Sequence, residues 1–213
     1  LHLCLVTALD GHVTTCYDIS RKGEMQMYWI LPGTTLQAER DQADQVESLF
    51  QPLFLAGGLT LSQVASVTGL ETHTIQNWVK RGFLPPPRNK RYDMEQVCRI
   101  LNINILKGPL PIEQITKLMA YLNGSLADES DDLVDDTVLY FMFVRLAARA
   151  RYIGGTKAWD DALTEITEDY EEPIPGAKQK FIQVLKIMLT AWCANRLQQK
   201  AMTMIQELET KES

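Results

Sequence analysis

Four polar side chains are spaced so that one face of a short helix could bond to the edges of nucleic-acid bases. They are Thr72, His73, Gln76 and Asn77, in the run from Glu71 to Gly82. Glutamine and asparagine can each bond to adenine through two hydrogen bonds, and histidine can donate to guanine or to a phosphate. We therefore expect these residues to contact base edges in the major groove of a duplex. The competing interpretation is an ordinary solvated helix face.

Basic residues follow this helix and gather before Tyr92. The group comprises Lys80, Arg81, Arg88, Lys90 and Arg91. Such a cluster can neutralise phosphates and fix the register of a protein on DNA, whereas the alternative is a surface that only keeps the protein in solution. Tyr92 either stacks on the sugar–phosphate backbone or packs under the basic loop. Trp78, in helical spacing with Ile75 and Val79, is expected in the core.

Two short helices must position these side chains. Thr60 can cap a helix over Leu61–Thr68, with Gln63 in capping-box position, and Gly69 supplies the left-handed residue that ends it. The second helix is expected to begin near Glu71 or Thr72 and to end before Gly82. Two short helices about three residues apart, with a glycine in the turn, form a helix-turn-helix pattern.

A short wing and two further helices should follow. The run Phe83-Leu84-Pro85-Pro86-Pro87 cannot be helical, and Arg88-Asn89-Lys90-Arg91 forms a polar tip. Asp93 can cap a third helix with Gln96 as its capping-box partner, and that helix continues through Leu106. Pro111 suits the first turn of a fourth helix, which ends at Asn123-Gly124.

The run from Leu61 to Pro85 resembles the DNA-binding head of MerR-type regulators. The shared features are the Ala and Gly of the first helix and turn, the Thr-aliphatic pair of the second helix, the Gly-aromatic-Leu-x-Pro run and a wing that closes on Arg-Tyr. The Asp-x-x-Gln-Val and Leu-Pro-Ile-Glu-Gln-Ile helices also fit. From about Thr35 to Val144 the chain resembles an uncharacterised bacterial family, a domain of unknown function, that carries such a head. The resemblance implies a winged helix-turn-helix over residues 59–124.

The sequence departs from the typical MerR-type head at several points. Such heads have a basic residue where Gln76 stands, often another at His73, and a longer wing. Their fourth helix leads into a long coiled-coil dimer helix, which is not apparent directly after Gly124. Metal sensors of that class need paired cysteines beyond the fourth helix, where this chain has only Cys193. Metal sensing is therefore not expected.

The flanking segments are expected to differ in structure. Residues 1–35 have Val-, Thr-, Tyr- and Ile-rich runs separated by Asp10-Gly11 and Lys22-Gly23, a pattern that suits a small β-meander. Residues 36–58 should form a linking helix over Gln37–Leu55, bent or ended by Pro52. Residues 125–213 are expected to form a helical bundle that serves dimerisation or effector binding. Its predicted helices are 137–152, 159–170 and a long one from Ala177 to about Leu208.

Composition and charge narrow the function classes. The 213 residues carry a net charge of −6, yet residues 60–107 hold seven bases against three acids, and residues 125–175 hold thirteen acids against four bases. This asymmetry favours local nucleic-acid binding over a general nucleic-acid coat. The four cysteines form no CxxC pair, so we expect reduced thiols, no structural metal and a cytoplasmic location. No signal peptide and no apolar run long enough to span a membrane is apparent.

Other chemistries are weakly represented in the sequence. No catalytic constellation and no cofactor motif is recognisable, so an enzyme is not expected. Six acids near the start of the C-terminal segment lack calcium-loop spacing and are interpreted as a solvated linker: Asp128, Glu129, Asp131, Asp132, Asp135 and Asp136. A pocket for an unidentified small-molecule effector, lined by Tyr140, Phe141, Phe143 and Trp192, competes with simple core packing of these rings.

The sequence as a whole predicts a mainly α protein that binds double-stranded DNA as a bacterial transcription regulator of MerR-like type. It should form a homodimer through its C-terminal helices. The first alternative is an architectural, excisionase-like protein that uses the same head to bend DNA. The second is a helical protein-interaction module in which the helix-turn-helix is only a scaffold, because the acidic remainder would weaken nonspecific DNA binding.

Overall fold

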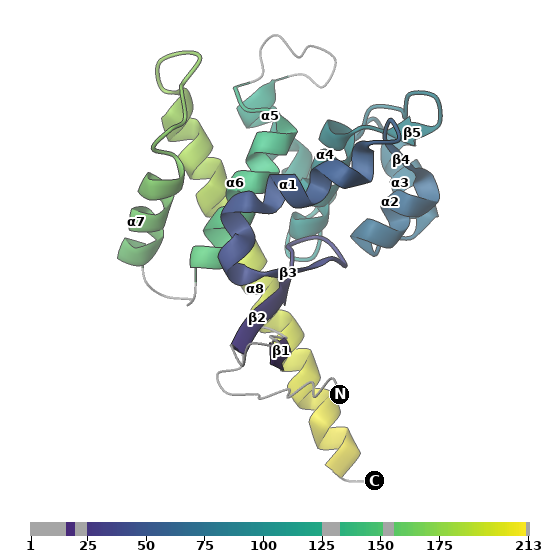
Figure 1. The fold of residues 1–213 in the computed structure, drawn as a ribbon, viewed down its shortest axis with the longest axis vertical. Helices are drawn as coiled ribbons and strands as arrows, with labels where there is room; N and C mark the ends of the chain where they lie inside the picture. The colour runs from purple at the N-terminus through teal and green to yellow at the C-terminus, as the bar shows by residue number, and fades with distance from the viewer. Residues whose placement is uncertain (1–15, 20–24, 125–132, 151–155, 212–213) are drawn as a thin grey trace.

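The computed structural model describes residues 16–19, 25–124, 133–150 and 156–211, and it is mainly helical (Figure 1). The order of the longer helices agrees with the predicted one. They are α2 (Leu61–Thr68), α3 (Thr72–Lys80), α4 (Met94–Leu106), α5 (Ile112–Asn123), α6 (Asp136–Arg149), α7 (Thr156–Ile166) and α8 (Ala177–Lys211).

Two strands of the predicted N-terminal β-meander are present in the described residues, whereas its third strand lies beyond the predicted segment 1–35. Strands β1 (Cys16–Ile19), β2 (Met25–Ile30) and β3 (Gln37–Glu39) form an antiparallel sheet in the order β1-β2-β3. Trp29 pairs with Ala38 across β2 and β3, and both side chains are buried. The predicted turns at Asp10-Gly11 and Lys22-Gly23 lie outside the described residues.

The predicted linking helix over Gln37–Leu55 was wrong as a continuous element. Its first residues form β3, and the rest consists of a 3₁₀ helix (Arg40–Gln45), the short helix α1 (Val46–Phe50) and a second 3₁₀ helix (Gln51–Phe54). Two physical reasons account for the difference. Hydrogen bonding to β2 holds the first residues in extended conformation. Pro52 has no backbone N–H to donate, so an α-helix cannot pass through it unchanged.

Helix α4 lies at the centre of the core and is buried on most of its faces. It packs against α6, α8, α2 and α5. The N-terminal half of α8 completes this core with a buried stripe of Phe181, Val184, Leu185, Met188 and Leu189. Residues of the predicted DNA-binding segment and of the C-terminal helices therefore share one hydrophobic core. Burial of this apolar surface is the main contribution that holds the two parts together.

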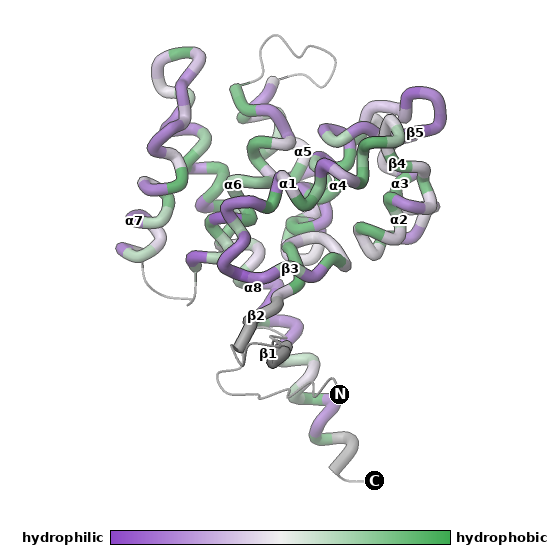
Figure 2. The backbone as a smooth tube through the Cα atoms, viewed as in Figure 1, coloured by the Kyte–Doolittle hydropathy of each residue, from purple (hydrophilic) through white to green (hydrophobic). Residues whose placement is uncertain are grey.

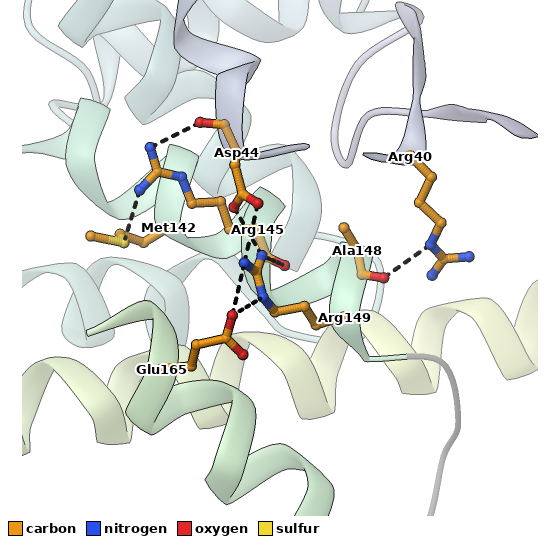
Figure 3. Close-up of polar contacts among 7 residues, drawn as sticks. All are labelled: Arg40, Asp44, Met142, Arg145, Ala148, Arg149 and Glu165. Atoms are coloured by element: carbon orange, nitrogen blue, oxygen red, sulfur yellow. Dashed lines mark hydrogen bonds and ion pairs between the residues drawn. The ribbon is translucent and has the colours of Figure 1, made fainter. Parts of the chain in front are cut away.

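An arginine network joins the segment before α1 to α6 and α7 (Figure 3). Arg149 bonds to Asp44 at 3.0 Å and to Glu165 at 3.1 Å. Arg145 donates to the carbonyl of Asp44 at 3.2 Å, and Arg40 donates to the carbonyl of Ala148 at 2.9 Å. The contact from Arg40 satisfies a carbonyl at the C-terminal end of α6, where cations are favoured by the helix dipole.

The C-terminal half of α8 projects beyond the rest of the molecule (Figure 1). Five large apolar side chains there are exposed: Leu197, Met202, Met204, Ile205 and Leu208. Among the described residues no helix, α8 included, is both long enough and apolar enough to cross a membrane. Exposed apolar side chains in such number commonly mark a contact surface for a partner.

Four aromatic side chains that could have lined an effector pocket are part of the core instead. Tyr140, Phe141 and Phe143 are buried, and Trp192 is half-buried. Phe143 and Trp192 pack edge to face at 6.1 Å between ring centroids, and Phe50 contacts both Tyr140 and Phe141. Tyr140 also donates to the carbonyl of Pro32 at 3.0 Å. These contacts agree with the core-packing interpretation of the rings.

Candidate nucleic-acid interface

The two short helices α2 and α3 are joined by the three residues that the sequence indicated. Thr60 caps α2 in a complete capping box, because its hydroxyl accepts from the backbone N–H of Gln63 and the Gln63 side chain accepts from the backbone N–H of Thr60. Gly69 ends α2 with φ of 67°, in the left-handed region that glycine adopts without steric cost. The polypeptide therefore turns sharply between Thr68 and Thr72.

Helix α3 has one buried and one exposed face. Ile75 and Trp78 are buried, as predicted, and fix the helix against the core. The other face exposes Thr72, His73, Gln76, Asn77 and Lys80. No side chain caps the N-terminus of α3, so its first backbone N–H groups remain available to an acceptor from outside.

A tight hairpin over Arg88–Arg91 lies in the segment that was predicted to form a wing. Strands β4 (Leu59–Thr60) and β5 (Arg91–Tyr92) pair antiparallel, and the backbone N–H of Arg91 donates to the carbonyl of Arg88 at 2.9 Å. Between Arg88 and Arg91, the two central residues Asn89 and Lys90 have φ of 50° and 62°. Two successive residues with positive φ form a type I′ turn, which suits asparagine at its first central position and glycine at its second. Lys90 therefore occupies a position where a non-glycine residue is strained.

The basic side chains of this end of the molecule differ in their surroundings. Lys80, Arg88 and Lys90 are exposed, and the structure gives none of the three an acidic partner among the described residues. The loop beside β5 is correspondingly hydrophilic (Figure 2). Arg91 is half-buried and donates to the carbonyl of Gly58 at 2.7 Å, so it also ties the hairpin to the segment before β4.

Arg81, at the C-terminal end of α3, is held by two neighbours. It bonds to Glu113 of α5 at 3.0 Å, and its guanidinium carbon lies 4.5 Å from the ring centroid of Phe83. Arg81, which was predicted to contact DNA, is thus exposed but already paired with an acidic residue. Glu113 was not among the residues predicted from the sequence, because it lies 32 positions further along the chain and its segment showed only a helix start.

Tyr92 was predicted either to contact the sugar–phosphate backbone or to pack under the wing, and its burial favours the second interpretation. Only 3% of its surface is exposed, and burial raises the pKa of its hydroxyl. Its position in β5 directs the ring toward the core beneath the hairpin. The Tyr92 ring therefore packs beneath the hairpin and is not exposed to a ligand.

A polar stripe on α4 connects the interface to the C-terminal helices. Gln96, Arg99 and Asn102 recur at intervals of three in a helix whose other residues are mostly buried and apolar. Gln96 donates to the carbonyl of Pro86 at 3.0 Å, and Arg99 donates to that of Phe83 at 3.1 Å. Asn102 donates to Asp136. The spacing of these residues was visible in the sequence and could have indicated the stripe.

The acids near the start of the C-terminal segment have two separate structural roles where they are described. Asp135 caps α6 by accepting from the backbone N–H of Thr137 at 2.6 Å. Asp136 is buried against Arg99. The residues 128–132 lie outside the described part of the chain. Within the described residues no three His, Cys, Asp or Glu side chains are arranged to hold a metal ion.

Two comparisons with known proteins found similarity over part of the chain. Residues 43–143 match the family model of a domain of unknown function, DUF1836. The chain is also similar to the uncharacterized protein YkrK of Bacillus subtilis (strain 168), with 30% identity over 84 residues. That similarity covers 38% of this chain and 36% of the relative, so the chain spans about a third of the relative's length. No solved structure matches this chain.

Proposed function

We propose that this protein binds double-stranded DNA, with α3 in the major groove and the Arg88–Arg91 hairpin against the sugar–phosphate backbone. The observation that carries the proposal is the exposed polar face of α3 at the same end of the molecule as a basic hairpin (Figure 1). Thr72, His73, Gln76 and Asn77 provide hydrogen-bonding groups for base edges. The uncapped N-terminus of α3 adds N–H groups and a positive dipole end that suit a phosphate.

The strained tip of the hairpin supports the same proposal. Lys90 has φ of 62° at a turn position where glycine would be relaxed. A strained residue that persists in a fold suggests a use for its side chain. An ammonium at the end of a hairpin can reach a phosphate, and in our proposal this contact is the reason for lysine at the position.

The substitution Lys90→Gly separates this role from folding. Glycine should relieve the strained φ and stabilise the fold by about 1 kcal/mol, since the left-handed conformation costs an L-residue roughly that amount. The same change should weaken binding to every duplex and reduce the log–log salt slope by about 0.9, the contribution of one phosphate contact. Urea unfolding and fluorescence anisotropy with a labelled duplex at several salt concentrations measure the two effects.

The matched control is Lys157→Gln, which removes one positive charge from the exposed surface of α7. Helices α7 and α3 lie on opposite sides of the molecule (Figure 1), so the control should leave both affinity and salt slope nearly unchanged. Affinity that does not depend on salt, or a Lys90→Gly variant that binds as tightly as the parent, would contradict the proposed role of the hairpin.

We further propose that DNA binding serves transcription regulation of the MerR-like type. The resemblance of residues 61–85 to such heads supports the role. A single head of this size contacts only a few base pairs, so selective binding requires two heads on one duplex. The exposed apolar side chains at the end of α8 offer the surface through which two copies would pair.

A protein-interaction module remains the second candidate function, and α8 is the observation that favours it. The exposed apolar residues of α8 would suit a partner other than a second copy just as well. The two candidates differ in what happens at α3. If DNA is the ligand, substitutions on the exposed face of α3 change duplex affinity; if α8 alone carries the function, they do not.

A further inference from the structure

The ion pair between Arg81 and Glu113 lies at the edge of the proposed DNA-binding surface. Arg81 Nη2 lies 3.0 Å from Glu113 Oε1, and the side chains are 54% and 62% exposed. Glu113 belongs to the first turn of α5, whereas Arg81 immediately follows α3. Solvent and a bound ligand can therefore reach both groups, and an ion pair this exposed contributes little to stability.

The position of Arg81 does not depend on Glu113. Its backbone N–H donates to the carbonyl of Asn77, and its guanidinium rests over the ring of Phe83. Phe83 is fixed in turn, since its N–H donates to the carbonyl of Trp78 and its carbonyl accepts from Arg99. Loss of the Glu113 carboxylate would leave the guanidinium in place with its N–H groups available.

The carboxylate of Glu113 and a DNA phosphate offer Arg81 the same chemistry. Each presents anionic oxygens to the guanidinium, and arginine pairs with both in a similar planar geometry. A phosphate that approaches Arg81 must displace Glu113 or come close to its negative charge, which is unfavourable at short distance. We propose that Glu113 is an internal competitor for the phosphate site at Arg81 and lowers the DNA affinity of the free protein. This inference rests on the proposed function.

A double-mutant cycle on the full-length protein tests the competition. Glu113→Gln should bind a random duplex about two- to five-fold more tightly than the parent, which corresponds to the usual strength of an exposed ion pair. The log–log salt slope should become steeper, because an additional phosphate contact contributes about −0.9. Arg81→Ala should cost little affinity in the parent and much more in the Glu113→Gln background.

The control variant is Asp161→Asn, which removes one negative charge from the exposed surface of α7 on the other side of the molecule (Figure 1). It separates a local effect from a change of net charge. Thermal unfolding of each variant shows that the fold is intact.

Three results would overturn the inference while DNA binding by the parent stands. The first is that Glu113→Gln binds the duplex no more tightly than Asp161→Asn does. The second is that Glu113→Gln binds more weakly than the parent, as expected if Glu113 positions Arg81. The third is that the double variant keeps the tighter binding, which would mean that Arg81 is not involved. If neither the parent nor Glu113→Gln binds any duplex, the proposed function fails and the inference fails with it.

Discussion

Arg99 of α4 and Asp136 of α6 form a buried ion pair with 2.9 Å between Nη1 and Oδ2. Their side chains are only 12% and 6% exposed. The Nε of the same arginine donates to the carbonyl of Phe83, in the segment that follows α3. One guanidinium therefore connects the segment that follows α3 to the first turn of α6.

Removal of the arginine should be costly because it leaves Asp136 buried without its cation. We expect Arg99→Ala to lower the free energy of unfolding by about 3–5 kcal/mol. Arg99→Met in combination with Asp136→Asn should recover much of the loss, since no charge is then buried unpaired. Urea unfolding measures both variants. A loss below about 1 kcal/mol in Arg99→Ala would show that solvent reaches Asp136.

The same pair predicts a pH dependence of stability. Burial raises the pKa of Asp136, and Arg99 offsets this effect only in part. A carboxyl group whose pKa is higher in the folded than in the unfolded state binds protons more tightly when folded. Its contribution to stability is therefore greatest below the ordinary aspartate pKa and is lost as the pH rises through the folded-state pKa.

The comparison of the parent with Asp136→Asn isolates this contribution. As the pH rises above the ordinary aspartate pKa, the parent should lose unfolding free energy relative to Asp136→Asn. The difference between the two proteins should become constant above the folded-state pKa. A difference that shifts in the opposite direction would mean that Arg99 lowers the pKa of Asp136 below its ordinary value.

Two adjacent glycines before β4 offer a matched test of the hairpin. Gly57 and Gly58 both have positive φ, but a Cβ added at Gly57 meets no atom within 4 Å, whereas one at Gly58 would lie 2.6 Å from the carbonyl oxygen of Tyr92. Gly57→Ala should therefore cost about 1 kcal/mol from conformation alone. Gly58→Ala should cost more and should also weaken DNA binding, because β5 must move. If the two variants lose equal unfolding free energy in urea, β5 can move aside at no cost.

Gln76 is the residue whose loss should change sequence preference. It lies on the exposed face of α3, and alanine is a better helix former, so Gln76→Ala should keep the fold. We expect a cost of about 1–3 kcal/mol on the preferred duplex and relaxed discrimination at one base pair, with nonspecific binding nearly unchanged. Selection from random duplexes measures the preference, and Gln179→Ala on α8 is the control. An unchanged motif would exclude a base contact by Gln76.

Local signals in the sequence predicted most of the central segment. Capping boxes at Thr60 and Asp93, and the left-handed stop at Gly69, depend on residues close together in the chain, and all three appear in the structure. Contacts between distant residues were not predicted. Neither the pairing of Glu113 with Arg81 nor that of Asp136 with Arg99 follows from spacing, because tertiary packing brings these residues together.

In the linking segment and in α8, the spacing of apolar residues did not predict the structure correctly. The apolar residues of 37–55 suited a helix, but pairing with β2 and the proline at position 52 divided the segment into four short elements. In α8 the pattern could not tell which apolar residues face a core. Leu189 is fully buried, whereas Ile187, Leu197 and Met204 on the same helix are exposed.

We expect two chains to pair through the C-terminal half of α8. Leu197, Ala201, Met204 and Leu208 recur at intervals of four and three residues, and all are exposed. This spacing is that of a coiled-coil seam, so a second copy could bury the row. Two-fold pairing would place two α3 helices about 34–36 Å apart, or at a multiple of that distance, as adjacent half-sites on DNA require.

Light scattering at micromolar concentration should give about twice the mass of one chain for the parent. Leu197→Lys combined with Met204→Lys should give the mass of a single chain, because two charges on each helix would be desolvated in the seam. The control Gln198→Lys, off the seam, should leave the dimer intact. These variants are preferable to truncation after Gly124, which would remove α6 and α8 and expose the buried residues of α4. A parent protein of single-chain mass that protects only one half-site in a DNA footprint would exclude this dimer.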